Sequence, residues 1–159
     1  MQSSLMTVSE ILQRFPTQEK SIDRLEQIRW QGRVHCAYCG GERICRHASG
    51  DRALVRWQCE DCHRAFSATV GTIFHGTHTP LRSWFLVLAT ALRAEGAPSA
   101  SQIARELGMR RATVSRMLRR LRPATKEDRF QRQLLLGLVA SDTSSNKQEM
   151  QARLKGRAK

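Results

Sequence analysis

The sequence lacks any long hydrophobic run. Its apolar stretches are short, as at Trp84–Ala89, whereas a membrane-spanning helix needs roughly 18 consecutive apolar residues. Residues 1–5 also lack the basic start and the long apolar core of a secretory signal. We therefore expect no membrane contact and a cytoplasmic location. In that reducing compartment, the five cysteines favour a metal site over disulfides.

Acidic residues are scarce. There are 14 of them against 27 lysines and arginines, so the chain carries a formal net charge of +13. The charge is uneven, because residues 1–100 contain 12 basic and 9 acidic side chains whereas residues 101–159 contain 15 and 5. A chain this basic indicates a polyanionic partner, with nucleic acid as the leading candidate. The second half is expected to hold the main binding surface.

Helix-capping signals stand near the start of the chain. Thr7 and Glu10 have the spacing of a capping box, which predicts a short helix that Pro16 ends. Thr17 can cap a second helix over about residues 18–29. Apolar residues recur in it at helical spacing, so this helix is expected to pack against the segment that follows.

The next segment, from residue 33 to residue 78, leans toward strand and is rich in glycine and cysteine. Its expected strands are residues 52–58 and 72–74. Such short strands cannot bury enough apolar surface to fold alone. A metal staple is therefore expected to supply the missing stability.

Four cysteines form two C-x2-C pairs. Cys36 and Cys39 precede a 19-residue gap, and Cys59 and Cys62 follow it, which is a spacing expected of a zinc site. Each two-residue gap lets a tight turn aim two sulfurs at one point, and tetrahedral zinc needs four such ligands at about 2.3 Å. Four thiolates close the shell, so a single structural ion is expected, with no position open to water or substrate.

Two alternatives stay open for these four cysteines, which can be buried thiols or can form two disulfides. The nearby His35, His47 and His63 offer nitrogen ligands, but a complete set of four thiolates leaves them outside the site. The fifth cysteine, Cys45, fits neither pair and is interpreted as a packed free thiol.

The following part of the chain reads as three helices. Thr79 and Pro80 begin the first, which ends near Pro98. The two shorter helices after it have the pattern of a helix-turn-helix, in which Gly108 takes the left-handed turn. Pro123 is expected to close the last of them.

The second helix of this pair has a basic, hydrogen-bonding face, which we interpret as a DNA-binding surface. Residues near its start are expected to contact bases, and the later arginines are expected to contact phosphates. Five arginines in residues 110–120 without one acidic residue would repel one another, and phosphate contacts would relieve that repulsion. The alternative is an ordinary helical pair with a solvated arginine face. The candidate base contacts are Arg111, Thr113 and Arg116, the candidate phosphate contacts are Arg119 and Arg120, and Arg110 and Ser115 complete the face.

These patterns together predict an α+β fold of four segments. They are an N-terminal helical segment at 1–32, a small β zinc ribbon at 33–78, a helical helix-turn-helix DNA-binding domain at 79–123 and a basic tail at 124–159. The helices flank the ribbon, and we expect the tail to be disordered because it is polar and basic.

The patterned residues resemble the N-terminal part of bacterial insertion-sequence transposases, which begin with a zinc ribbon and continue into a DDE-type catalytic domain. The resemblance covers roughly residues 8–122. It implies that Cys36, Cys39, Cys59 and Cys62 are the ribbon ligands and that the helix-turn-helix recognises the element's terminal repeats in double-stranded DNA. The matching segments are Phe15-Pro16, Leu25–Trp30, Trp57–Cys62, Phe66-Ser67, Gly71–Phe74 and Thr79–Trp84.

The resemblance stops before the catalytic domain. Only 37 residues run from Pro123 to the last residue, which is too few for such a domain, and residues 138–142 are a poor match for its first catalytic strand. Glu127, Asp128 and Glu149 read more simply as surface charges. Without convergent carboxylates there is no two-metal site for phosphodiester cleavage, so the chain as written is not expected to be an enzyme.

Three functions stay open. The first is a DNA-binding protein of a bacterial transposable element, acting at the nucleoid as a truncated transposase, an end-binder or a repressor. The second is the recognition part of an active transposase whose catalytic domain is supplied elsewhere. The third is a zinc-ribbon adaptor or transcription factor. None of them requires a membrane or a small-molecule substrate, and a homo-oligomer is compatible with all three.

Overall fold

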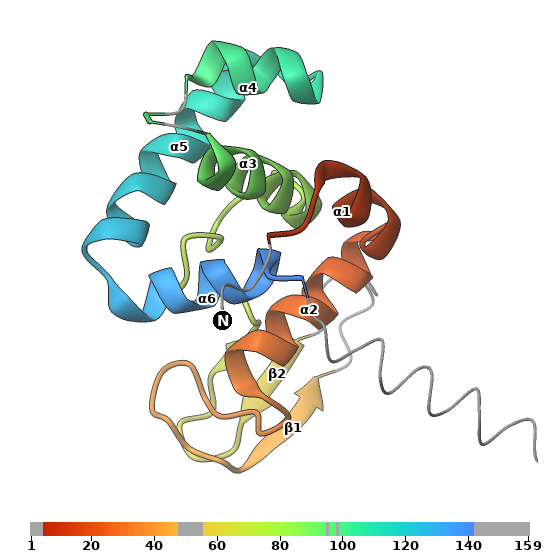
Figure 1. The fold of residues 1–159 in the computed structure, drawn as a ribbon. Coiled ribbons are helices and arrows are strands. Elements are labelled where there is room, and N and C mark those ends of the chain that lie inside the picture. The colour runs from red at the N-terminus through yellow and green to blue at the C-terminus, as the bar shows by residue number, and fades with distance from the viewer. Residues whose placement is uncertain (1–4, 48–55, 95, 98, 142–159) are drawn as a thin grey trace, which may run out of the picture.

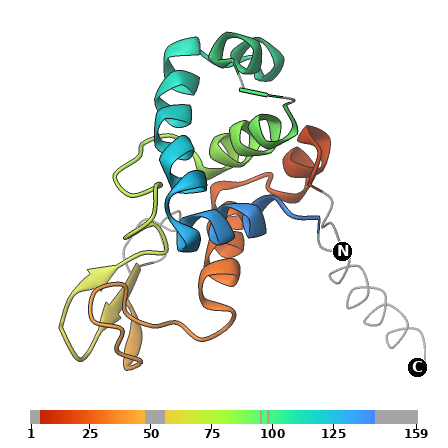
Figure 2. The same ribbon diagram turned by 60° about the vertical axis from the view of Figure 1, so that its left-hand side comes forward.

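The computed structural model describes residues 5–47, 56–94, 96–97 and 99–141. In this part of the chain a small sheet lies at one end of the molecule and α4 lies at the other, as Figures 1 and 2 show. The predicted α+β fold, with a small sheet flanked by helices, is confirmed. No helix within these ranges is long and apolar enough to cross a membrane. The helices are α1 (Val8–Arg14), α2 (Gln18–Trp30), α3 (Leu81–Arg93), α4 (Ala100–Leu107), α5 (Arg111–Lys126) and α6 (Arg129–Val139), and the strands are β1 (Ile44–His47), β2 (Arg56–Cys59) and β3 (Ala65–Phe66).

Side-chain caps determine where the first two helices begin. The Thr7 amide donates to Glu10 Oε2 at 2.6 Å and the Glu10 amide donates to Thr7 Oγ1 at 3.1 Å, which is the predicted capping box. The Lys20 amide donates to Thr17 Oγ1 at 3.3 Å and so caps α2. Helix α2 ends at Gln31, which has a left-handed backbone with φ of 49°. Both predicted starts are confirmed.

Helix α3 is the centre of the molecule, because it packs against each of the other five helices. It begins one residue later than expected, with Pro80 as its N-cap. Its buried Phe85 meets Phe15 edge to face with ring centroids 5.2 Å apart, and Trp84 meets Phe74 in the same way at 5.5 Å. One continuous cluster of buried side chains therefore joins the helices to the ribbon.

The sheet is antiparallel in the order β1-β2-β3. Strand β2 confirms the second half of the predicted strand at 52–58, and residues 52–55 lie outside the described part of the chain. The predicted strand at 72–74 is wrong, since these residues form turns. Thr72 Oγ1 donates to the Thr69 carbonyl at 2.7 Å and accepts from the Phe74 amide at 3.2 Å. Such local side-chain bonds compete with strand pairing.

The C-terminal end of α2 holds the sheet against the helices. Trp30 packs edge to face against Trp57 of β2 and Phe66 of β3, at 6.2 and 6.0 Å between ring centroids. The Trp57 indole donates to Glu26 Oε1 at 2.8 Å. The Arg29 guanidinium donates to two carbonyls in the loop after β3, those of Ala68 at 2.6 Å and Val70 at 2.5 Å. The ribbon is therefore fixed in orientation relative to the helices by aromatic contacts and hydrogen bonds.

Pro123 lies inside α5, so the prediction that it closes this helix is wrong. An interior proline removes one backbone hydrogen bond and costs about 3 kcal/mol. Leu121 and Ala124 are buried on either side of it, and α5 packs against both α3 and α6. Tertiary packing of this apolar face outweighs the local preference for ending the helix.

The expectation that residues 124–159 form a disordered tail is wrong for the first part of that range, because residues 129–139 form α6. Asp128 is not simply a surface charge, since its Oδ1 accepts from the Gln131 amide at 3.0 Å and caps this helix. Four apolar side chains of α6 are buried in the protein. They are those of Leu134, Leu135, Leu138 and Val139.

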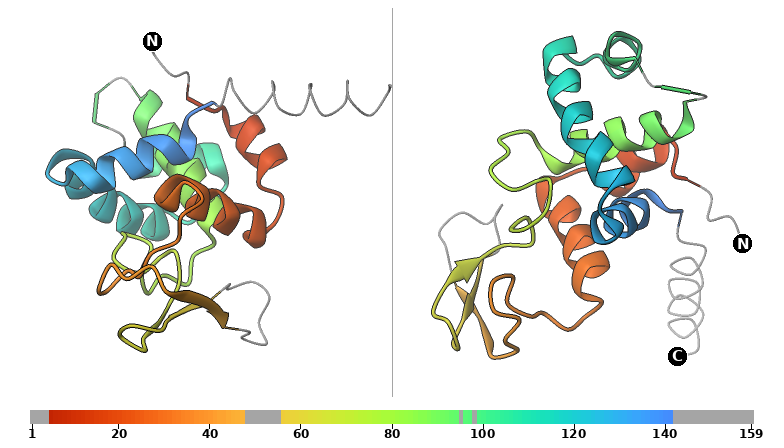
Figure 3. Two further views of the ribbon diagram at one scale, coloured as in Figure 1. Left: turned by 90° about the horizontal axis from the view of Figure 1, so that it is seen from below. Right: turned by 90° about the vertical axis from the view of Figure 1, so that its left-hand side faces the viewer.

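Helix α6 lies against α2, as the view from below in Figure 3 shows. The buried Arg24 of α2 donates to the carbonyls of Gly137 at 2.8 Å and Ala140 at 3.3 Å, which satisfies the end of α6. Residues 138 and 139 are thus the end of a helix, and the weak match to a catalytic strand is wrong. Asp142 and Glu149 lie outside the described residues.

Candidate metal centre and nucleic-acid interface

The two C-x2-C pairs meet at one point of the ribbon. Cys36 and Cys39 lie in the loop between α2 and β1, whereas Cys59 ends β2 and Cys62 follows it in the turn to β3. The four Sγ atoms all lie within 4.8 Å of one another. Across the pairs, Cys36 Sγ lies 3.6 Å from Cys62 Sγ, and Cys39 Sγ lies 3.6 Å from Cys59 Sγ.

This arrangement fits one tetrahedral zinc ion. Four sulfurs at about 2.3 Å from a central ion stand about 3.8 Å apart along each edge of the tetrahedron, close to the measured 3.6 Å separations. All five cysteines are free, so the disulfide alternative does not hold. The predicted site of one structural zinc ion, held by Cys36, Cys39, Cys59 and Cys62, is confirmed in its geometry.

The two cysteine turns have the same backbone design. The Cys36 amide donates to the Gly41 carbonyl at 2.8 Å, and the Cys59 amide donates to the Arg64 carbonyl at 3.0 Å, five residues on in both cases. The residue after the second cysteine of each pair is left-handed, with φ of 75° at Gly40 and 58° at His63. Each turn therefore reverses the chain at once, which aims both of its sulfurs at the shared centre.

Gly41 differs from Gly40 in having a close neighbour. A Cβ atom on Gly41 would collide with the carboxylate of Asp61 in the other cysteine turn. That carboxylate is held in place by Arg43, whose Nε donates to Asp61 Oδ1 at 2.6 Å. The side-chain-free position lets the two turns approach closely.

Backbone amides prepare the sulfurs to carry negative charge. Burial favours the neutral thiol of Cys36, but hydrogen bonds from Cys39, Tyr38 and Cys62 lower its pKa to about 7. The Gly41 amide favours the Cys39 thiolate, but burial and the neighbouring sulfurs oppose this and raise the Cys39 pKa to about 12. Adjacent sulfurs cannot all ionise by themselves. A divalent cation at their centre would supply the compensating charge.

His63 is not needed as a ligand, because the four sulfurs form a complete set without it. Its role is in the backbone, where a residue with a Cβ atom pays about 1–2 kcal/mol for a left-handed conformation. We predict that His63→Gly keeps one zinc ion per chain and raises the melting temperature by about 2–8 °C. Metal analysis and thermal unfolding check this, and loss of zinc would show that the imidazole is a ligand.

Cys45 differs from its interpretation as a packed thiol. It lies on β1 and is exposed, with its Sγ 3.7 Å from the Gln58 carbonyl of the neighbouring strand. Alternation along β1 explains this, because a one-residue offset places Cys45 on the opposite face from Ile44, which packs against the core.

Helices α4 and α5 form the predicted pair. Gly108 has a left-handed backbone with φ of 63° and ends α4, and the Met109 amide then donates to the Ala104 carbonyl at 2.9 Å. Ala104 and Val114 are buried between the helices. The turn from Gly108 to Arg110 brings the start of α5 close to the end of α4.

The candidate DNA-binding residues lie on the side of α5 that faces away from this core. All five arginines are exposed, and Thr113 and Ser115 are half-buried. Arg120 forms a hydrogen bond within the protein, since its Nη2 donates to the His75 carbonyl at 3.2 Å. Among the described residues, no carboxylate forms an ion pair with the other four, Arg110, Arg111, Arg116 and Arg119. Within the described part of the chain, the basic face is therefore left without compensating carboxylates.

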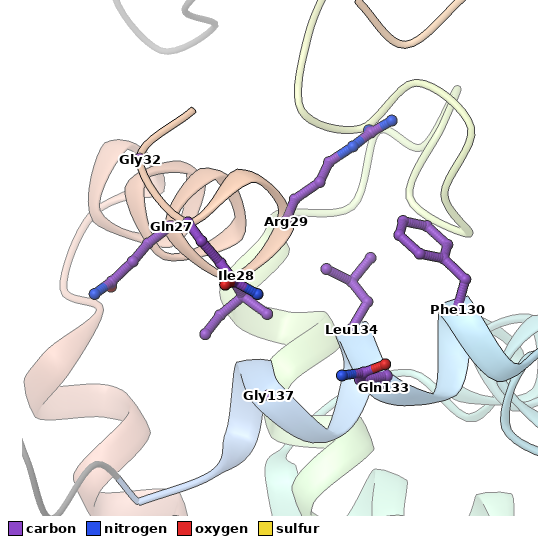
Figure 4. A pocket seen from close by; sticks show the side chains of 9 residues that line it. Gln27, Ile28, Arg29, Gly32, Phe130, Gln133, Leu134 and Gly137 are labelled. Atoms are coloured by element: carbon purple, nitrogen blue, oxygen red, sulfur yellow. The ribbon is translucent and has the colours of Figure 1, made fainter. Parts of the chain in front are cut away.

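A further concavity lies elsewhere, between the end of α2 and α6, and has a volume of 790 Å³ (Figure 4). The half-exposed Phe130 lies in its wall. The Arg29 side chain extends from α2 toward the loop after β3, where it donates to the Ala68 carbonyl. The polar side chains of the concavity are those of Arg29 and three glutamines, and none of the described residues that line it is a carboxylate or a cysteine. The lining residues besides Arg29 and Phe130 are Gln27, Ile28, Gln31, Gly32, Gln133, Leu134 and Gly137.

Comparison with known proteins agrees with the zinc geometry. The chain is 33% identical over 109 residues to an uncharacterized protein in transposable element ISH50 of Halobacterium salinarum. The alignment covers 69% of this chain and 36% of that protein, so the chain spans only about a third of the relative's length. No solved structure matches the chain. Residues 16–65, which contain all four clustered cysteines, match the family model of the transposase zinc-ribbon domain.

Proposed function

We propose that the chain is a DNA-binding protein of a transposable element, which recognises the element's ends through α5. The observation that carries the proposal is the exposed arginine face on the second helix of a closely packed pair, with no carboxylate partner in the described chain. The second helix of such a pair is the one that enters the major groove of DNA. The transposase zinc ribbon beside it, and a relative named for its transposable element, support the same assignment.

In this proposal the first turns of α5 contact bases, and its later residues contact phosphates. Arg111, Thr113 and Arg116 lie in the first two turns, where side chains reach base edges. Arg119 lies a turn later and contacts phosphate, as does Arg110 before the helix begins. Arg120 already donates to the His75 carbonyl, so it positions the loop that contains His75 as well as contributing charge.

The chain is proposed to bind DNA without cutting it. Within the described residues, the four cysteines form the metal-ligand cluster and no group of three carboxylates accompanies them. Strand cleavage by two metal ions requires convergent carboxylates. We assign the strand cleavage of transposition to a region of the longer relative that this chain does not match. We also place the protein in the cytoplasm at the nucleoid, where its DNA substrate is.

Selection of bound duplexes from a random pool tests the proposal. We predict one sharp consensus, and affinity for it that falls with salt at a log–log slope of about −4.5, on the assumption that each of the five arginines of the basic face neutralises one phosphate and contributes about −0.9. Filter binding or fluorescence anisotropy at several salt concentrations gives the slope. A slope near zero, or an equal recovery of all sequences, would contradict recognition of element ends. A zinc-ribbon adaptor predicts that result.

A further inference from the structure

A groove connects α5 to the zinc ribbon. Its first part, of 410 Å³, lies between the arginine face of α5 and the loop that precedes α3. Its second part, of 510 Å³, lies between the same loop and the ribbon, where Tyr38 forms its edge. Residues 76–79 line both parts. The two parts therefore adjoin each other at this loop.

The groove has the chemistry of a surface for phosphate. Among the residues that the structure describes, no acidic side chain lines either part. Arg116 and Arg119 stand at one end, and at the other end the Arg64 guanidinium lies 5.1 Å from the centroid of the exposed Tyr38 ring. Between these ends the groove is lined by hydroxyl groups and imidazoles, which bind phosphate oxygens. The polar residues between the two ends are Ser67, Thr69, His75, Thr77, His78 and Thr79.

The loop that both parts of the groove share is held in place by hydrogen bonds within the protein. Thr77 Oγ1 accepts from the Trp84 indole at 3.3 Å and from the Thr79 amide at 3.1 Å. Arg120 holds the His75 carbonyl from the other side. In the described structure the amides of Gly76 and His78 donate to no protein group, and both residues are exposed. These amides are available to an anion without any rearrangement of the loop.

We propose that the sugar-phosphate backbone of the DNA bound by α5 continues along this groove to the Tyr38–Arg64 pair, so that the zinc ribbon is a second DNA contact. This inference rests on the proposed function of α5. It also explains why the ribbon is fixed to α2 by Trp30 and Arg29, because a second contact adds affinity only when it is held at a fixed distance from the first. The ribbon contact adds length to the site and carries no sequence preference.

The test compares Arg64→Ala with Arg33→Ala on duplexes of two lengths. Both arginines are exposed and lie in the ribbon segment, and Arg64 lies against Tyr38, which lines the groove, whereas Arg33 does not line it. On a long duplex, Arg64→Ala is expected to lower affinity about fivefold to tenfold and to reduce the salt slope by about 0.9. On a duplex trimmed to the bases read by α5, both variants should bind like the unsubstituted protein. Each variant should keep one zinc ion per chain, which controls for folding.

Phosphate ethylation interference supplies a second readout. We expect interfering phosphates to extend beyond the bases read by α5, and those at the far end to lose their effect in Arg64→Ala. Equal affinities for Arg64→Ala and the unsubstituted protein on the long duplex, with interference confined to the α5 site, would overturn the ribbon contact and leave the proposed function standing. Failure to bind duplex DNA of any length would overturn both.

Discussion

Cys59→Ser should abolish stoichiometric zinc binding and unfold the ribbon. Cys59 is fully buried at the end of β2, and its sulfur lies 3.6 Å from that of Cys39. A serine hydroxyl is a poor zinc ligand at neutral pH, and three sulfurs leave the shell open. Structural zinc in small domains contributes apparent binding energies of about 10–16 kcal/mol, most of which appears as folding energy. In its described residues the ribbon has three short strands to replace it.

The loss of structure in Cys59→Ser should include the end of α2 but leave α4 and α5 folded. Phe66 and Trp57 of the ribbon pack on Trp30, so loss of the ribbon exposes one end of the central core. Helices α4 and α5 pack on each other and on α3, and are expected to stay largely helical. The measurements are metal content, tryptophan fluorescence and far-ultraviolet circular dichroism. A chelator should reproduce the effect in the unsubstituted protein.

Cys45→Ser is the matched control for this prediction. It makes the same chemical change 14 positions away, at an exposed sulfur outside the cluster. This variant should keep one zinc ion per chain and its melting temperature. The four-thiolate site would be rejected if Cys59→Ser retained a full zinc ion, or if both variants lost zinc equally.

The zinc site was predictable because its signal is local. Two residues between paired cysteines dictate a tight turn, and the identity of the ligands then requires the two turns to meet. The helix caps at Thr7 and Thr17 and the left-handed Gly108 are local in the same sense. At each of these positions the structure agrees with the sequence, since a few neighbouring residues determine the conformation.

The errors occurred where distant residues decide. Strand β1 was not predicted because four residues give too little alternation, and its pairing of Ile44 with Cys59 depends on the two cysteine turns closing first. Pro123 carries a strong local signal for ending a helix, which buried contacts with α3 and α6 outweigh. Helix α6 did carry a helical signal, since buried side chains at 131, 134, 135 and 138 have its spacing. The basic composition around it concealed that pattern.

The groove residues could not have been identified from the sequence. Arg64 and His75 are single basic residues in separate loops, and nothing in their local sequence links them to α5. The fold connects them, through the Arg120 bond to the His75 carbonyl and the stacking of Arg64 on Tyr38. The DNA-binding role of the α5 arginines stays a prediction, whereas their exposure on one helix is observed.

The α5 arginines should differ in what their loss does to DNA binding. A base contact by arginine contributes about 1–3 kcal/mol of discrimination, so Arg111→Ala with Arg116→Ala should weaken the selected site by about 10²–10⁴-fold and broaden its consensus. Arg119→Ala removes a phosphate contact. It should weaken all sequences alike, by about tenfold, and reduce the salt slope by about 0.9.

The matched control is Arg132→Ala, which removes an exposed arginine from α6 and leaves α5 intact. It makes the same reduction in net charge as Arg119→Ala. The long-range attraction of the protein to DNA depends on its total charge, whereas a phosphate contact depends on where the arginine lies. The two variants therefore separate these effects. Equal losses for Arg119→Ala and Arg132→Ala would mean that α5 acts only through general charge. If the consensus stayed unchanged in Arg111→Ala with Arg116→Ala, base reading would have to lie on another element, and the α5 assignment would be wrong.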